Sequence, residues 1–368
     1  MIKLKLCQAV AAIAALTAAA AAQAVATTSS PSDWRLVPGQ TFNGVAGAMD
    51  GVVRIAYTDA AGGASACSGS LLAGGQFVLT AAHCAADFQS MKVYVGWADG
   101  SVSDIRQVAP SNAYINPLWH SVNDTDNGAD LAILKLDRAV TSVKGYNLST
   151  TNDVGKNYLI AGYGRTGVGD SADEPNGKDV LWGHYGYNTY DVSSQTFDRK
   201  AAETIPGLGY DPAFYAPGVT YRSDFDDGTA AHNTLGRIGG ATGDGWGSGT
   251  GLGAAEALAA DGDSGAGEFV WNGSEWLLSG VHSWTAQGSD FCPAFGLAGC
   301  DASDTNPSSF GDLSGASATF SQIAWIRAVT AVPEAETYAM LLSGLALMGA
   351  LARRRRNGRV APSAAGRQ

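Results

Sequence analysis

The sequence is poor in charged side chains, and cations are the scarcer kind. Lys and Arg number 23 against 34 Asp and Glu in 368 residues, charged residues make up 15%, and the formal net charge is −11. Proteins that bind nucleic acid neutralise phosphates with clustered Lys and Arg, and no internal stretch supplies such a cluster. Helices on a protein surface draw on Glu and Lys at helical spacing. The composition therefore excludes a nucleic-acid-binding protein and argues against a mainly helical fold.

Internal repeats are also missing, and short strand-like runs are present in their place. No segment recurs at a solenoid period, whereas glycine is frequent, with 48 residues. Runs rich in β-branched and aromatic residues, each bounded by turn residues, lie at 52–58, 76–82, 91–97, 131–136, 157–164 and 276–284. This pattern predicts an all-β sandwich or barrel. Residues 165–255 are predicted to be long Gly-rich loops, and residues 316–328 a closing helix.

The first 26 residues have the layout of a secretory signal peptide. Lys3 and Lys5 precede an apolar, Ala-rich run, which ends in two overlapping small-residue exits, Ala22-Gln23-Ala24 and Ala24-Val25-Ala26. We therefore expect a signal peptide over 1–26 and an exported protein. A buried Ala-rich helix is the alternative. Residues 27–44 are rich in turn formers and are expected to be a linker or pro-segment.

The last segment of the chain, 332–368, has a different organisation. Val332-Pro333-Glu334 precedes the apolar stretch 338–352, and four arginines follow at 353–356. The stretch is shorter than the about 20 residues that usually span a bilayer, and the arginines predict a cytoplasmic end, with the body facing outward. This order resembles the PEP-CTERM sorting tail, although Ala335 replaces the usual second proline. The resemblance implies removal of the tail by an exosortase and an extracellular or outer-envelope location. An ordinary membrane anchor facing outward is the alternative.

Three short segments of the body, expected to be one domain over 45–331, carry groups that acyl transfer needs. His83 precedes the last residue of the segment Leu79–Cys84, Asp130 begins the apolar run to Leu136, and Ser264 lies in Gly262-Asp263-Ser264-Gly265. Each segment alone is ordinary. Together they resemble the trypsin/chymotrypsin-like serine peptidases. Further matches are Cys67–Leu72, Gly162–Gly164, Ser283-Trp284 and Trp325-Ile326.

This resemblance implies a fold and a mechanism. The fold would be two six-stranded antiparallel β-barrels with a C-terminal helix. Ser264 would be the nucleophile, His83 its general base and Asp130 the residue that orients His83, while the amides of Gly262 and Ser264 form the oxyanion hole. The substrates would be proteins or peptides, and no cofactor is needed. A binding module without activity and an enzyme acting mainly on esters are the rival hypotheses.

The cysteines agree with export. Cys7 would leave with the signal peptide, and four cysteines then allow three pairings. The resemblance favours Cys67–Cys84, which leaves Cys292 to pair with Cys300. The family's usual bridge beside the nucleophile is missing, because Ala260 occupies one of its positions. We therefore expect a rearranged specificity pocket.

The resemblance also suggests which residues bind substrate. Leu258 would form the floor of the pocket, and Ser283, Trp284 and Thr285 the strand along the substrate backbone. A leucine floor predicts a preference for uncharged side chains. Glu256 is either a displaced acidic determinant or, as we expect, a solvated loop carboxylate.

Family zymogens are cut before a segment whose new amine pairs with the aspartate ahead of the nucleophile, here Asp263. Val45-Ala46-Gly47-Ala48 is a weak match to that segment and predicts a cut after Gly44.

Metal binding is not expected. Asp224, Asp226 and Asp227 form an acidic turn that could hold calcium, but it lacks the full EF-hand ligand pattern, and a solvated turn is the preferred interpretation. The histidines that the motifs leave unused lack metal-ligand spacing with the cysteines; they are His120, His184, His232 and His282.

Overall fold

A computed structural model of the chain describes residues 25–170, 179, 181–243, 245–331 and 348. The signal peptide expected over 1–26 lies outside these residues except for its last two. The apolar stretch 338–352 lies outside them except for Met348. Within the described ranges, no helix is long and apolar enough to cross a bilayer. Residues up to Ile326 belong to one compact unit, whose fold follows.

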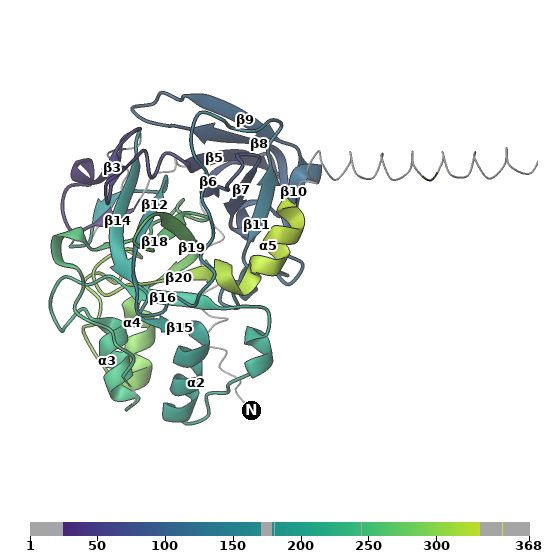
Figure 1. The fold of residues 1–368 in the computed structure, drawn as a ribbon. Helices are drawn as coiled ribbons and strands as arrows, with labels where there is room; N and C mark the ends of the chain where they lie inside the picture. Colours follow the sequence, from purple (N-terminus) through teal and green to yellow (C-terminus); the bar gives the residue numbers. More distant parts are fainter. Residues whose placement is uncertain (1–24, 171–178, 180, 244, 332–347, 349–368) are drawn as a thin grey trace, which may run out of the picture. The chain divides into compact units, whose positions relative to one another are not determined.

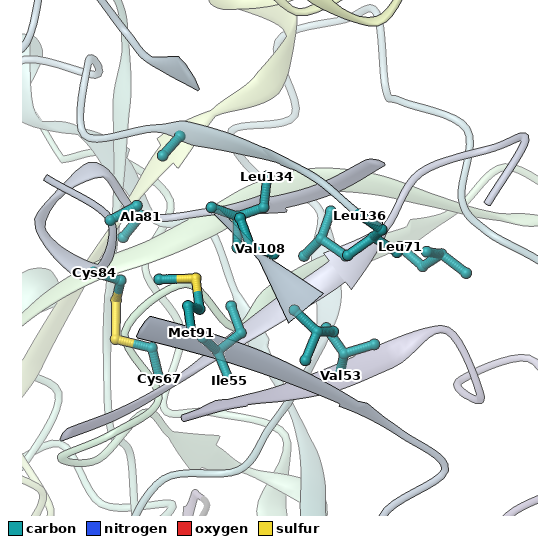
Figure 2. Packing of buried hydrophobic residues seen from close by; sticks show 14 of the residues in the cluster. Val53, Ile55, Cys67, Leu71, Ala81, Cys84, Met91, Val108, Leu134 and Leu136 are labelled. Carbon is teal, nitrogen blue, oxygen red and sulfur yellow. A yellow bond between two sulfur atoms is a disulfide. The ribbon is translucent and has the colours of Figure 1, made fainter. Parts of the chain in front are cut away.

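The first large sheet has seven antiparallel strands in the order β10-β11-β7-β6-β5-β8-β9. These are β5 (Val52–Asp59), β6 (Ala64–Leu71), β7 (Phe77–Thr80), β8 (Phe88–Val95), β9 (Asp104–Val108), β10 (Ala113–Ile115) and β11 (Ala132–Lys135). All four residues of β7 are buried. Figure 2 shows Met91 and Ile55 beside the disulfide, and Leu134 beside Val108 in the same core.

The second large sheet has eight antiparallel strands in the order β15-β16-β20-β19-β18-β12-β14-β2. These are β2 (Arg35–Leu36), β12 (Asn157–Gly162), β14 (Gly183–Thr189), β15 (Val192–Ser193), β16 (Thr220–Asp224), β18 (Gly267–Trp271), β19 (Trp276–Ala286) and β20 (Leu313–Ala318). Its core includes three tyrosines in a row, with ring centroids 4.2 Å apart for Tyr158 and Tyr190 and 4.1 Å apart for Tyr190 and Tyr221. Figure 1 shows the blue first sheet beside the teal and green second one.

Two small sheets complete the β structure. In one, β1 (Ala26–Thr27) lies between β13 (Gly167–Val168) and β17 (Ala257–Leu258), parallel to the former and antiparallel to the latter. In the other, β3 (Thr41–Phe42) pairs with β4 (Val45–Ala46). The chain therefore joins its folded unit well before residue 45, where the sequence had suggested that the domain begins.

The predicted mostly-β architecture is confirmed, and most of the strands form two large antiparallel sheets. The sheets have seven and eight strands rather than six each. The additional pairing comes from edge strands of five residues or fewer, namely β9, β10, β15 and β2. Such short strands carry too few residues for a recognisable alternation of apolar and polar side chains.

The segment 165–255, predicted to be loops, contains regular structure as well. It holds β14 and β16 and two helices, α2 (Ser194–Thr204) and α3 (Thr234–Ala241). Helix α2 begins where the Ser193 hydroxyl accepts a hydrogen bond from the amide of Thr196 at 3.2 Å, and it buries Phe197 and Ala201 on one face. Figure 1 shows α2, α3 and α4 (Gly288–Phe291) close to β15 and β16.

The helix predicted over 316–328 begins later than expected. Strand β20 continues to Ala318, a short 3-10 helix follows, and α5 covers Ile323–Thr330. The small residues Ser317 and Ala318 pair with β19 instead of starting a helix. The 3-10 helices of the chain are Pro31–Trp34, Ala82–Cys84, Pro110–Asn112, Val122–Asp124, Pro212–Tyr215, Gly253–Ala255, Cys292–Phe295 and Thr319–Gln322.

Both disulfides inferred from the resemblance are present, Cys67–Cys84 and Cys292–Cys300. The first closes a sequence separation of 17 residues and the second one of 8. Because a longer closed loop removes more entropy from the unfolded chain, Cys67→Ala/Cys84→Ala should lower the free energy of unfolding by about 3 kcal/mol. Urea unfolding measures this loss. Cys292→Ala/Cys300→Ala is the matched control and should lose less, so a larger loss in the control would contradict the expectation.

Candidate active site

His83 and Asp130 lie together between the end of β7 and the start of β11. The imidazole Nδ1 of His83 is 2.7 Å from Oδ2 of Asp130, and the backbone N–H of His83 donates to Oδ1 at 3.0 Å. The short 3-10 helix Ala82–Cys84 presents the histidine, and the disulfide from Cys84 to Cys67 fixes that turn to β6. Asp130 is completely buried, whereas a fifth of the His83 side chain is exposed. Asp130 thus holds Nδ1 of the imidazole, while part of the His83 ring remains exposed to solvent.

The carboxylate of Asp130 has further support. The hydroxyl of Ser283, on β19, donates to Oδ2 at 2.5 Å. Burial raises the pKa of Asp130, but the charge of His83 and the hydrogen bonds outweigh it, so that the net pKa is lowered. Burial likewise lowers the pKa of His83, and the nearby negative charge and hydrogen bond of Asp130 overcome this and raise it above 6.5. The pair is therefore arranged to stabilise an imidazolium.

Ser264 lies in a tight turn that is fastened against the histidine segment. Gly262 and Gly265 have φ values of +88° and +82°, which L side chains rarely adopt. A Cβ atom at Gly265 would lie 2.1 Å from the Thr80 hydroxyl oxygen and 2.3 Å from the Ser68 carbonyl oxygen, so only glycine fits there. The Ser264 carbonyl accepts a hydrogen bond from the Ser68 amide at 2.8 Å and lies 3.6 Å from the sulfur of Cys84.

The expected oxyanion donors have no competing acceptor. In the part of the chain that the structure describes, neither the amide of Gly262 nor that of Ser264 donates to a protein group. No hydrogen bond joins the Ser264 hydroxyl to His83 among the same residues. Catalytic hydrogen bonds are often long before substrate binds. The turn that holds Ser264 thus lies against Cys84, which follows His83, and among the described residues the serine hydroxyl has no hydrogen-bond partner.

The carboxylate of Asp263, next to Ser264, accepts hydrogen bonds from three backbone amides. Its Oδ2 accepts from the amides of Val25 at 2.8 Å and Ala260 at 2.9 Å, and its Oδ1 accepts from Gly164 at 2.8 Å. The sequence instead suggested Val45 as the new amino terminus that would reach this carboxylate. Val45 pairs with Phe42 in the β3-β4 hairpin. In the uncut chain the residue beside Asp263 is thus Val25, in a segment that gave no strand signal, and a cut after Gly44 stays a prediction.

Another histidine, which is buried, lies near the candidate triad and was not singled out by sequence reasoning. His282 precedes Ser283 on β19 and is 3% exposed, and its carbonyl accepts from Gly265 at 2.8 Å. Burial, assisted by the nearby charge of His83, lowers its pKa to about 3. His282 is thus neutral at ordinary pH. Only its position immediately before Ser283 could have directed attention to it.

The residues expected to bind substrate lie in two environments. Leu258 is fully buried, in a cluster with Ala26, Phe225 and Phe310. Trp284 and Thr285 are half-buried on β19. The indole of Trp284 covers Gly315, where a Cβ atom would lie 2.1 Å from the ring. Leu258 is therefore part of the core in this structure rather than an exposed pocket floor, while the strand with Trp284 remains partly accessible.

The acidic residues near this region are buried, which corrects two expectations. Glu256 is 1% exposed and accepts from the amide of Leu252 at 2.6 Å, so it is not a solvated loop carboxylate. Asp224 and Asp226 are also buried, so the acidic turn is not a solvated one. Burial raises the pKa of Glu256 to about 8, of Asp224 to about 7 and of Asp226 to about 10. Within the described ranges, no three His, Cys, Asp or Glu side chains are arranged to hold a metal ion.

Comparison with known proteins agrees with this geometry. Residues 41–188 match the Trypsin family model, a range that contains His83 and Asp130 and ends before Ser264. Residues 41–188 of the chain are therefore similar to a Trypsin-family domain. A curated relative, proproteinase E of Bos taurus, is 36% identical over 113 residues, which are 28% of this chain and 44% of that protein. The chain thus spans less than half the length of this relative.

Two further matches complete the comparison. A solved structure of HL collagenase is 18% identical, with a TM-score of 0.47, over 81% of this chain and 97% of the other. Residues 331–356 match the PEP-CTERM protein-sorting motif. This match confirms the resemblance of the C-terminal segment to the PEP-CTERM sorting tail. Nearly all of the matched tail lies outside the residues that the structure describes.

Proposed function

We propose that this trypsin-like chain is an exported serine endopeptidase that hydrolyses peptide bonds through Ser264, His83 and Asp130. The observation that carries the proposal is the 2.7 Å contact between His83 and the completely buried Asp130. A buried carboxylate on Nδ1 leaves the other imidazole nitrogen as a proton acceptor. A histidine held in this way, beside a serine in a Gly-bounded turn, is the arrangement that acyl transfer requires.

The reaction follows from these groups. Nε2 of His83 would accept the hydroxyl proton as Ser264 attacks the carbonyl carbon, and the amides of Gly262 and Ser264 would bind the resulting oxyanion. His83 would then give the proton to the leaving amine as the C–N bond breaks. A water molecule would hydrolyse the acyl-enzyme by the same steps. Asp130 would stabilise the imidazolium formed in each half of the reaction.

We infer that the protein acts outside the cytoplasm. The expected signal peptide over 1–26 would direct export, and the PEP-CTERM motif at 331–356 supports processing by an exosortase-like enzyme. The processed protein would be extracellular or at the outer envelope. A body of net negative charge is soluble and has little affinity for anionic surfaces. Mass spectrometry of the exported protein would test this, because tail removal predicts an end ahead of the apolar stretch.

Assays with a protein substrate, an ester and a peptide ligand distinguish the peptidase, esterase and binding hypotheses. We expect the protein to digest casein and to react with a fluorophosphonate. Ester hydrolysis without casein digestion would favour the esterase hypothesis. Tight binding of peptides with neither reaction would favour the binding module.

The preferred side chain before the cut is expected to be uncharged. Leu258 is apolar, and Glu256, with a pKa raised to about 8, is largely protonated at neutral pH and exerts little attraction on Arg or Lys. A peptide library should therefore show cleavage after uncharged residues. Strong selection for Arg or Lys at that position would contradict this expectation.

Activity should have an acid limb set by His83. The histidine must be neutral to accept a proton, and Asp130 raises its pKa above 6.5, so activity should decline as the pH falls through a midpoint above that value. The pH profile of kcat/KM measures this midpoint. An acid limb centred well below 6.5 would mean that the pair does not hold the imidazole as described.

A further inference from the structure

A cation lies in the interior of the second sheet. Arg222, on β16, is 2% exposed, and its Nε donates to the Ser194 hydroxyl at 2.9 Å. Its Nη2 donates to Asp126 at 2.5 Å and to Asp198 at 3.2 Å. The Ser194 hydroxyl in turn donates to the other oxygen of Asp126 at 2.5 Å. Ser194 and Asp198 belong to α2, and Asp126 precedes the candidate catalytic Asp130, so one guanidinium joins β16, α2 and the segment that leads to Asp130.

The same guanidinium contacts two aromatic rings. Its Cζ lies 4.1 Å from the ring centroid of Phe197, on α2, and 5.4 Å from that of Trp284, on β19. A cation within about 6 Å of a ring centroid is attracted to the face of the ring. Gly315 also lies against the indole of Trp284, because a Cβ atom there would be 2.1 Å from the ring. The position of Trp284 therefore depends on the glycine of β20 and on Arg222.

The segment from Thr125 to Asp130 is fixed by two different strands. Asp126 is bound by Arg222, from β16. The carbonyl oxygen of the preceding residue, Thr125, lies 3.2 Å from the hydroxyl of Ser283, on β19. That hydroxyl also donates to Asp130 at 2.5 Å. Arg222 thus supports, through separate contacts, both Trp284 on the strand expected to bind substrate and the segment beside it.

The chemistry of a buried ion pair indicates what this arrangement is for. Such a pair adds little net stability in comparison with apolar side chains of similar volume, because both charges lose their hydration. Its directional hydrogen bonds nevertheless specify one geometry. Resting on the proposed function, we propose that Arg222 is a positioning residue that holds the Trp284 indole and the segment ahead of Asp130 in the arrangement that binds extended peptide substrates. The chemical step at Ser264 would not depend on it.

This role predicts a difference between long and short substrates. A peptide that continues for several residues ahead of the cut would lie along β19 and contact Trp284. A small reagent would meet only the groups that react, Ser264 and His83. A shift of the indole would therefore weaken the binding of the long substrate and leave the reactivity of the serine unchanged.

The test compares two reagents that both phosphonylate Ser264. One is a small fluorophosphonate, and the other is a peptidyl phosphonate with four residues ahead of the phosphorus, the nearest one uncharged. The ratio of their rate constants measures the peptide contacts and does not depend on the fraction of protein that is folded. Arg222→Lys keeps the charge but loses the planar fork and the flat face that meets the rings. It should lower this ratio by at least about 10-fold, as expected when a binding group is displaced.

Another buried arginine supplies the matched control. Arg106, on β9 of the first sheet, is 4% exposed and donates to Asp104 and to the carbonyl of Arg138. Arg106→Lys should lower the free energy of unfolding and leave the ratio unchanged. A double variant, Arg222→Met/Asp126→Asn, removes both charges of the buried pair and should also lower the ratio. It keeps the test decisive if Arg222→Lys does not fold.

The outcomes separate this inference from the proposed function. A lower ratio in the folded Arg222 variants, with no change in Arg106→Lys, would support the positioning role. An unchanged ratio in a folded Arg222 variant would overturn the inference and keep the serine peptidase, even if both rate constants fell in equal proportion. An equal fall of the ratio in Arg106→Lys would overturn it too. A folded, unmodified chain that reacts with neither reagent would overturn the proposed function and the inference with it.

Discussion

Ser264→Ala is expected to lower kcat/KM for peptide hydrolysis by at least about 10⁴-fold. Alanine has no hydroxyl to form the acyl-enzyme, and the remaining groups can only polarise the substrate and orient water. Peptide hydrolysis with the purified, exported protein measures the loss. The side chain of Ser264 has no hydrogen-bond partner among the described residues, so its removal should leave the free energy of unfolding nearly unchanged.

A second serine supplies the control for this substitution. Ser68 lies beside the same turn, where its hydroxyl donates to the Gly262 carbonyl at 3.2 Å and accepts from the Tyr163 amide at 2.8 Å. Ser68→Ala should therefore reduce stability more than Ser264→Ala but retain far more activity. Similar losses of activity in both variants would indicate that the effect of Ser264 is structural.

Asp130→Asn should cost about 10⁴-fold in kcat at neutral pH, almost as much as loss of the nucleophile. The backbone N–H of His83 and the hydroxyl of Ser283 both donate to the carboxylate, so an amide oxygen is retained in one of these contacts. The amide nitrogen then donates to Nδ1 of His83. The imidazole proton moves to Nε2, where it blocks acceptance of the serine proton.

Stability and a second substitution distinguish this tautomer effect from misfolding. Ser283→Ala removes one donor to Asp130 but preserves the charge on the carboxylate, so its activity should fall much less. Thermal unfolding of both variants should remain cooperative. A folded Asp130→Asn variant that kept most of its activity would contradict the assignment of Asp130 as the residue that orients His83.

The sequence could locate His83, Asp130 and Ser264 because each lies in a short motif with characteristic neighbours. The pairing of Cys67 with Cys84 followed from the same resemblance. Strand runs such as 52–58 were recognisable because β-branched residues dominate them. Short motifs and local composition are sufficient to predict features of this kind from the sequence.

Other features depend on contacts between distant segments. The contact between Val25 and Asp263 escaped sequence analysis because the neighbouring strand β1 has only two residues and its partners lie near residues 167 and 258. Glu256 has the composition of a loop residue, yet it is buried because its carboxylate accepts the Leu252 amide. Helix α2 has few apolar residues, so its two buried apolar positions, Phe197 and Ala201, gave too weak a periodic signal.

The most direct test of the central claim is the location of a covalent adduct. The exported protein, treated with a fluorophosphonate and digested, should carry one phosphonyl group, on the peptide containing Ser264. Acid below the pKa of His83 should slow its formation, because a protonated imidazole cannot accept the serine proton. An unlabelled Ser264 in folded, exported protein, or an adduct on a different residue, would contradict the account.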